Sequence, residues 1–86
     1  MSAYVQESRI RDLELAIQGT IDSIKMFQEK LAAETSEDDV YFSFLNTHSL
    51  VRRGAKYLRN AIKNNEYLLD LQNQEMAHLK KMAEIL

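Results

Sequence analysis

Apolar residues in the first third of the chain recur at an alternating spacing of three and four positions. Thr20 holds the one polar place in this series, whose other members are Ile10, Leu13, Ile17, Ile24, Phe27 and Leu31. This heptad spacing is typical of a helix that buries one stripe of its surface against a second helix. The pattern predicts a first helix over about residues 4–33.

A polar segment from Glu34 to Asp39 ends this pattern and contains the only strong boundary in the chain. Ser36 is followed three residues later by Asp39, which is a variant of the capping box found at helix starts. The acidic residues 37–39 also suit the positive end of a helix dipole. We therefore predict a turn over residues 34–38 and the start of a second helix near residue 38.

Beyond the boundary a second heptad series continues to the end of the chain. Its members are Tyr41, Phe44, His48, Val51, Ala55, Leu58, Ile62, Asn65, Leu69, Gln72, Met76, Leu79, Ala83 and Leu86. The series predicts one helix over about residues 38–85, because no step in it is skipped. The expected fold is all-α: an antiparallel helical hairpin with a long second helix, in a single domain over residues 1–86. A break at Asn64-Asn65 would instead give a three-helix bundle.

The second predicted helix has more apolar surface than the first can cover. It extends well past the first helix, and apolar residues flank its seam on both sides. Soluble monomers rarely leave so large an apolar patch exposed, so we expect a homo-oligomer, such as a four-helix bundle or a larger assembly, and binding to another protein. The candidate partner-binding residues are Leu68, Leu71, Met76, Leu79, Met82 and Ile85.

A basic segment lies in the same helix, since five basic residues and no acidic one fall between Asp39 and Glu66. Four of them follow a 4-3-4 spacing that forms one helical stripe, and the fifth lies beside it. Such a stripe can bind a nucleic acid, an anionic small ligand or an acidic protein partner. It can equally be a solvated flank neutralised by carboxylates of the first helix such as Glu14. The candidate anion-binding residues are Arg52, Arg53, Lys56, Arg59 and Lys63.

The length, cysteine content and net charge of the chain exclude several kinds of site and partner. A chain of 86 residues buries a small core, which makes a lone domain marginally stable. Without cysteine it can form neither a disulfide scaffold nor a thiolate metal site. The net charge of −2 provides no global field for nucleic acids or membranes. Neither a signal peptide nor a membrane span is recognisable, so we expect a cytoplasmic location and no membrane partner.

Catalytic motifs are missing from the sequence. Glu75 and His78 have the Glu-x-x-His spacing of di-iron carboxylate bundles, but the expected hairpin places no carboxylate of the first helix opposite Glu75. We therefore predict no metal, no cofactor and no enzymatic activity. The expected function is that of a protein–protein interaction module, such as a small chaperone, adaptor or inhibitor. In size and composition the chain resembles small helical-hairpin chaperones of secretion systems and small phage inhibitors, although no motif assigns it to either.

Overall fold

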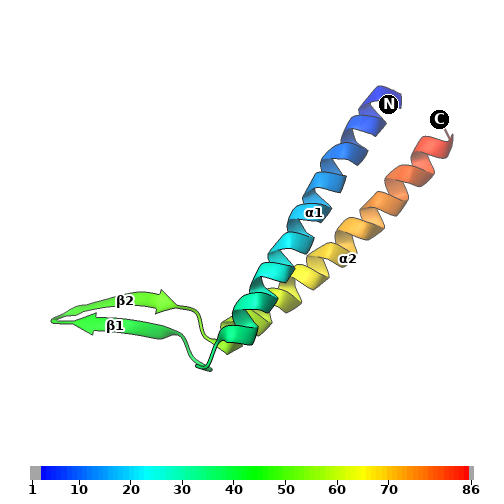
Figure 1. Cartoon of the computed structure of the whole chain (residues 1–86). Helices are drawn as coiled ribbons and strands as arrows, with labels where there is room; N and C mark the ends of the chain where they lie inside the picture. The colour runs from blue at the N-terminus through cyan, green and yellow to red at the C-terminus, as the bar shows by residue number, and fades with distance from the viewer. Residues whose placement is uncertain (1–2, 86) are drawn as a thin grey trace.

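The computed structural model describes residues 3–85, which form two long helices and a two-stranded sheet (Figure 1). In chain order these are α1 (Ala3–Ala33), β1 (Val40–Phe44), β2 (Thr47–Arg52) and α2 (Ala55–Ile85). The helices run antiparallel and side by side, so that α1 begins and α2 ends at the same end of the molecule. The β-hairpin projects from the other end, and the molecule measures 63 × 24 × 14 Å.

The β-hairpin contradicts the all-α prediction. Residues 38–54, expected to open a long second helix, instead contain both strands, and α2 begins only at Ala55. The segment Val40–Phe44 consists of one β-branched residue, three aromatic residues and one serine, and these residue types favour strands. Its apolar residues also fit a helical heptad, because short apolar runs are compatible with either period.

Both predicted helical bundles are also wrong, since the described chain contains one helix pair and one sheet. The alternative three-helix bundle required a break at Asn64-Asn65, but α2 is continuous through both residues. Within the helix, Asn65 Nδ2 donates a hydrogen bond to the carbonyl oxygen of Ala61 over 2.8 Å. This bond engages the Asn65 side chain within the helix rather than at a cap.

The core lies in the seam between α1 and α2. Its buried apolar residues are Ala55, Leu58, Ile62, Met76 and Leu79, all of which belong to the second heptad series. Both helices have 31 residues, so α2 does not overrun α1 as the longer predicted helix would have done.

Polar side chains occupy some of the buried positions between the two helices, which reduces the apolar area of the core. Thr20 is buried, and its hydroxyl donates to the carbonyl oxygen of Ala16 over 3.1 Å. Gln6 is also buried, and neither polar atom of its side chain has a hydrogen-bond partner among the residues that the structure describes. The helix pair therefore has a small apolar core.

The hairpin is a tight antiparallel pair in which Phe42 lies opposite Ser49 and Phe44 opposite Thr47. Residues 45–46 form the turn, and Leu45 has a positive φ of 55°. Near the base of the hairpin the register shifts, so that β2 contains one residue more than β1. Only the base of the hairpin faces the helices, since Tyr41 lines one pocket with residues of α2 and residues 50–52 line another with residues of both helices. The rest of the hairpin projects away from the helix pair (Figure 1).

Candidate functional site

The predicted basic stripe is divided among three parts of the structure. Arg52 ends β2, Arg53 lies in the connection after it, and the other three basic residues lie on α2. Arg59 forms an ion pair with Glu37 of the segment between α1 and β1. The five residues therefore do not all lie along one helix, because the chain enters α2 only after Gly54.

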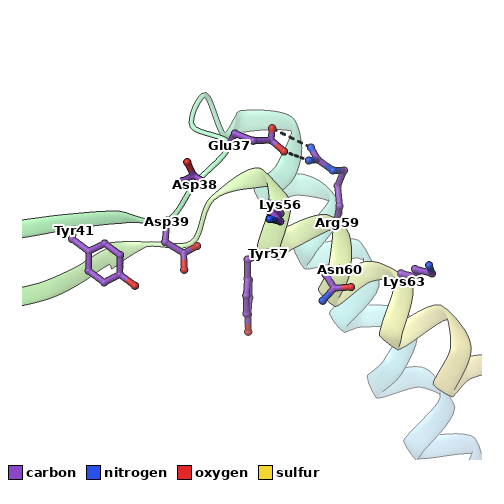
Figure 2. Close-up of a pocket in the computed structure, with 9 residues that line it drawn as sticks. All are labelled: Glu37, Asp38, Asp39, Tyr41, Lys56, Tyr57, Arg59, Asn60 and Lys63. Carbon is purple, nitrogen blue, oxygen red and sulfur yellow. Dashed lines mark hydrogen bonds and ion pairs between the residues drawn. The ribbon is translucent and has the colours of Figure 1, made fainter.

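A groove of about 670 Å³ lies where α2 begins (Figure 2). Lys56, Arg59 and Lys63 line its α2 side, and the acidic residues 37–39 line the opposite side. Because both signs of charge face this groove, it does not resemble an anion-binding site, which would present mainly cations. Among the described residues, no group of three or more His, Asp or Glu side chains is placed to hold a metal ion.

The segment after α1 caps the start of α2. The N–H of Ala55 donates to the carbonyl oxygen of Ser36 over 2.8 Å, and that of Lys56 to the carbonyl oxygen of Glu37 over 3.1 Å. These bonds satisfy N–H groups that have no acceptor within the helix itself. The acidic residues 37–39 thus lie at the positive end of a helix, as the sequence suggested, but that helix follows the hairpin rather than the acidic residues.

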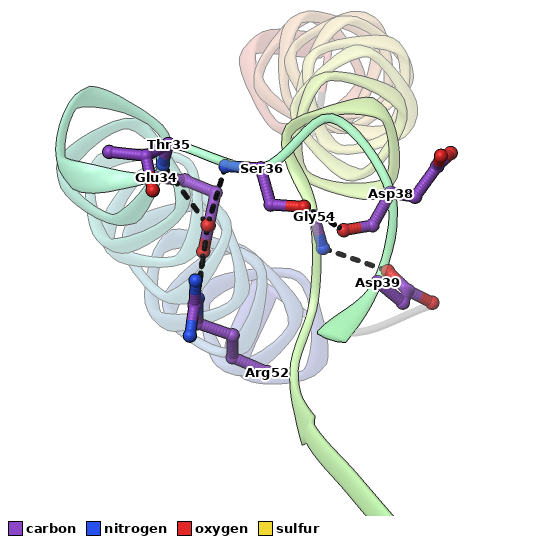
Figure 3. Close-up of polar contacts among 7 residues, drawn as sticks. All are labelled: Glu34, Thr35, Ser36, Asp38, Asp39, Arg52 and Gly54. Carbon is purple, nitrogen blue, oxygen red and sulfur yellow. Dashed lines mark hydrogen bonds and ion pairs between the residues drawn. The ribbon is translucent and has the colours of Figure 1, made fainter. Parts of the chain in front are cut away.

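Glu34 holds the end of β2 close to the end of α1 (Figure 3). Its carboxylate accepts hydrogen bonds from the N–H of Ser36 over 2.9 Å and from Arg52 Nε over 2.9 Å. The bond from the Ser36 backbone, followed by that from Arg52, lowers the pKa of Glu34. The carboxylate therefore stays ionised at neutral pH and ties the end of β2 to the segment that follows α1.

Asp39 forms a second set of contacts between the hairpin and the helices. We call the two segments that connect the hairpin to the helices, residues 34–39 and 52–54, the junction. Its Oδ1 accepts from the N–H of Gly54 over 2.8 Å, and its Oδ2 pairs with Arg53 Nη1 over 2.9 Å. The Gly54 N–H, and then Arg53, lower the pKa of Asp39, while Asp39 raises the pKa of Arg53. The Arg53 guanidinium also lies 4.4 Å above the ring centre of Tyr57. Its position is therefore fixed by two contacts, one with the Asp39 carboxylate and one with the Tyr57 ring.

We expect the stability of this junction to depend on pH through its carboxylates. A carboxyl group whose pKa is lowered by folding stabilises the folded state above its unfolded pKa of about 4, and this stabilisation is lost as pH falls through the lower folded pKa. An Asp39→Asn variant keeps an oxygen acceptor for Gly54 but loses the charge that faces Arg53. Thermal unfolding should show it less stable than the wild type at pH 7, with the difference shrinking as the pH falls below the unfolded pKa of about 4. A difference that stays constant from pH 7 to pH 2 would contradict this account.

Most of the predicted partner-binding residues of α2 lie in one of two environments. Met76 and Leu79 are buried against α1 and are not available to a partner in this structure. Leu68 and Leu71 are each 43% exposed and Ile85 is 78% exposed, whereas Met82 is half-buried. The seam and the flank of α2, which the sequence joins into one broad face, therefore have different roles.

The largest apolar surface outside the helices is the β-hairpin, which the sequence analysis did not identify. All residues from Tyr41 to Arg53 are exposed. Phe42 and Phe44 are 61% and 63% exposed and stack on each other, with ring centres 6.4 Å apart. Two signals could have revealed the hairpin. One is the strand-forming composition of Val40–Phe44, and the other is the second short segment, Thr47–Arg52, which follows after only two residues.

No described helix is both long and apolar enough to cross a membrane. Comparison of the chain with known protein families, with curated proteins and with solved structures finds no match.

Proposed function

We propose that this chain is a non-enzymatic protein–protein interaction module whose main docking element is the β-hairpin. The observation that carries the proposal is the exposure of every residue of Tyr41–Arg53, including two stacked phenylalanines, on a hairpin that projects from the helix pair and meets it only at its base. Contiguous apolar surface of this kind marks interaction sites in soluble proteins. An exposed strand edge also offers backbone N–H and C=O groups to an added strand.

The conformation of Leu45 supports a role for the hairpin tip in binding. Leu45 has a φ of 55° and is 87% exposed. A bulky residue is strained in the left-handed region, where glycine would be preferred in a two-residue turn. Since the side chain contacts little in the monomer and its backbone is strained, its presence is accounted for by a contact with a partner.

We assign a smaller role in binding to two other surfaces, the exposed flank of α2 and the basic residues. The exposed Leu68 and Leu71 on the flank of α2 would widen the contact with a partner. Binding of a nucleic acid or anionic ligand through the basic residues has less support, because Arg52, Arg53 and Arg59 are each paired with a carboxylate.

Site-specific crosslinking tests the docking element. A photoreactive phenylalanine analogue at position 42 should yield crosslinked protein adducts in a lysate of the native host, because this side chain faces the proposed contact. The same analogue at position 15 is the control, since Leu15 is 74% exposed on α1, away from the hairpin. Adducts from position 15 and none from position 42 would contradict the proposal.

A Leu45→Gly variant separates binding from folding. Glycine relieves the strain at the turn, which costs about 1–2 kcal/mol for other residues, so the variant should unfold at the same or a higher temperature. Loss of one buried leucine from the contact should lower the crosslinking yield from position 42 by roughly tenfold. An unchanged yield from the correctly folded variant would show that the tip does not contact the partner.

A further inference from the structure

The two edges of the β-hairpin differ in regularity. Between the pairs Tyr41–Leu50 and Val40–Arg52, β2 contains the extra residue Val51. A bulge of this kind twists a strand and disrupts its edge for pairing. β1 has no extra residue, so its outer edge is regular, and no other described element covers it.

This regular edge also lacks the usual protection against pairing. Natural edge strands are commonly protected by charged residues or proline, yet residues 40–51 contain neither proline nor any Asp, Glu, Lys or Arg. In β1, Ser43 is the one residue that is neither aliphatic nor aromatic, and it lies between Phe42 and Phe44. A strand without charged residues cannot form ion pairs with a charged partner strand. Its best-matched partner is therefore another strand without charged residues.

We propose that the occupant of this edge is a second copy of this chain, whose β1 pairs antiparallel with the first β1 about a two-fold axis at Ser43. The two hairpins then form one four-stranded sheet. Self-pairing of an antiparallel edge is closed by a two-fold axis, so the assembly stops at a dimer. This inference rests on the proposed function and names the partner for the same hairpin.

The register explains why the strand complements itself. About an axis at Ser43, Phe42 lies opposite Phe44 of the second copy, and the reverse pair is generated by symmetry. Four phenylalanine rings thus gather on one face of the sheet, extending the stack already present in each hairpin. On the other face Tyr41 lies opposite Leu45 of the second copy, which gives the exposed and strained tip residue a contact. Cross-strand aromatic pairs of this kind stabilise sheets.

The size of the surface fits a weak dimer. Tyr41, Phe42 and Phe44 are 56–63% exposed, and because a buried aromatic side chain covers about 150–250 Å², they offer roughly 300–400 Å² of apolar surface. A stable dimer of standard size buries about 800 Å² on each partner. We therefore expect dissociation at concentrations of about 1–100 μM, within the range of sedimentation measurements.

A pair of proline variants tests which edge is used. The turn at 45–46 makes Phe44 and Thr47 a hydrogen-bonded pair, so in the next pair Ser43 and His48 direct their N–H groups outward, toward opposite edges. Both Ser43→Pro and His48→Pro remove one outward N–H and the 2.7 Å contact between Ser43 Oγ and His48 Nδ1. Only Ser43→Pro alters the β1 edge.

In sedimentation of the purified full-length chain, we expect Ser43→Pro to raise the dissociation constant of the dimer about 30-fold, because two symmetric hydrogen bonds are lost. His48→Pro should change it less than about threefold. Equal dimerisation of both variants would overturn the proposal in favour of contacts through the helices, and a monomeric wild type would overturn it outright.

A pair of cysteine variants tests the register without depending on proline. The native chain contains no cysteine, so any disulfide must come from the substituted position. Residues paired across antiparallel strands have Cα atoms about 4.5–5.5 Å apart, within the range for a disulfide. Mild oxidation should therefore crosslink Ser43→Cys into a covalent dimer and leave His48→Cys, on the opposite edge, monomeric. Equal crosslinking of both variants, or none of Ser43→Cys, would overturn the register.

Failure of this inference is distinguishable from failure of the proposed function. If the purified chain stays monomeric while position 42 crosslinks to a different protein in the host lysate, the hairpin is a docking element for another partner and self-pairing is refuted. If neither experiment yields a contact at the hairpin, both proposals fail.

Discussion

Replacing Gly54 with alanine is expected to lower the unfolding temperature by roughly 10–25 °C. An added Cβ would lie 2.3 Å from the carbonyl carbon of Asp38, 2.4 Å from its oxygen and 2.5 Å from the carbonyl oxygen of Glu37. All three atoms belong to the backbone, so no flexible side chain can move aside. The chain at 37–38 must shift, and with it the carbonyl groups of Ser36 and Glu37 that cap α2. Steric overlap and a lost cap together cost roughly 2–4 kcal/mol.

Gly19→Ala is the matched control for this prediction. A Cβ at Gly19 meets nothing within 4 Å, and the residue lies inside α1. Alanine is favoured over glycine in a helix interior by about 1 kcal/mol, so this variant should unfold roughly 4–8 °C higher. Differential scanning calorimetry of both variants at one protein concentration measures the contrast. Similar shifts in both would show that the chain at Asp38 does not cross close to Gly54.

Leu79→Ala is expected to destabilise the fold by about 2–5 kcal/mol, measured as the free energy of unfolding in urea. Leu79 is only 3% exposed in the seam between the helices. The truncation removes apolar surface from a core that contains few other buried side chains, so little neighbouring structure can refill the space.

Leu71→Ala provides the comparison, because the same substitution is made on the exposed flank of the same helix. Leu71 is 43% exposed, and its truncation should cost about 1 kcal/mol or less. Together the two variants test the division of the predicted partner-binding residues into a seam and a flank. A larger loss for Leu71→Ala than for Leu79→Ala would mean that the flank, not the seam, contains the core.

The two heptad series predict the helix pair more accurately than they predict its connection. α1 spans Ala3–Ala33, close to the predicted range, and five members of the second series between Ala55 and Leu79 are buried in α2. Long periodic segments carry many independent positions, so chance cannot easily reproduce their pattern. Tyr41, Phe44, His48 and Val51 also fit the heptad but lie in strands, because four matching positions are too few to distinguish a helix from a hairpin.

Several features of the junction could not be inferred from the sequence. The same linear neighbourhood contains Arg52, Arg53 and Lys56, yet Arg52 pairs with Glu34 and Arg53 with Asp39, while no ion pair involves Lys56 among the described residues. Helical spacing placed Arg52 and Lys56 on one stripe, with Arg53 beside it, because it assumed a helix through residue 54. Once the chain enters and leaves a hairpin, residues 18 and 14 positions apart become neighbours.

By itself, the sequence determined that two amphipathic helices pair through heptad positions, since periodicity is a local property that burial of one face converts into contacts. Only the tertiary structure decided that residues 40–52 leave the helix pair as an exposed hairpin. That outcome depends on contacts between distant residues: the Ser36 and Glu37 carbonyls capping α2, and the chain at Asp38 passing close to Gly54. The apolar surface in excess of what α1 covers, predicted on an overlong helix, therefore lies mainly on the hairpin and the flank of α2.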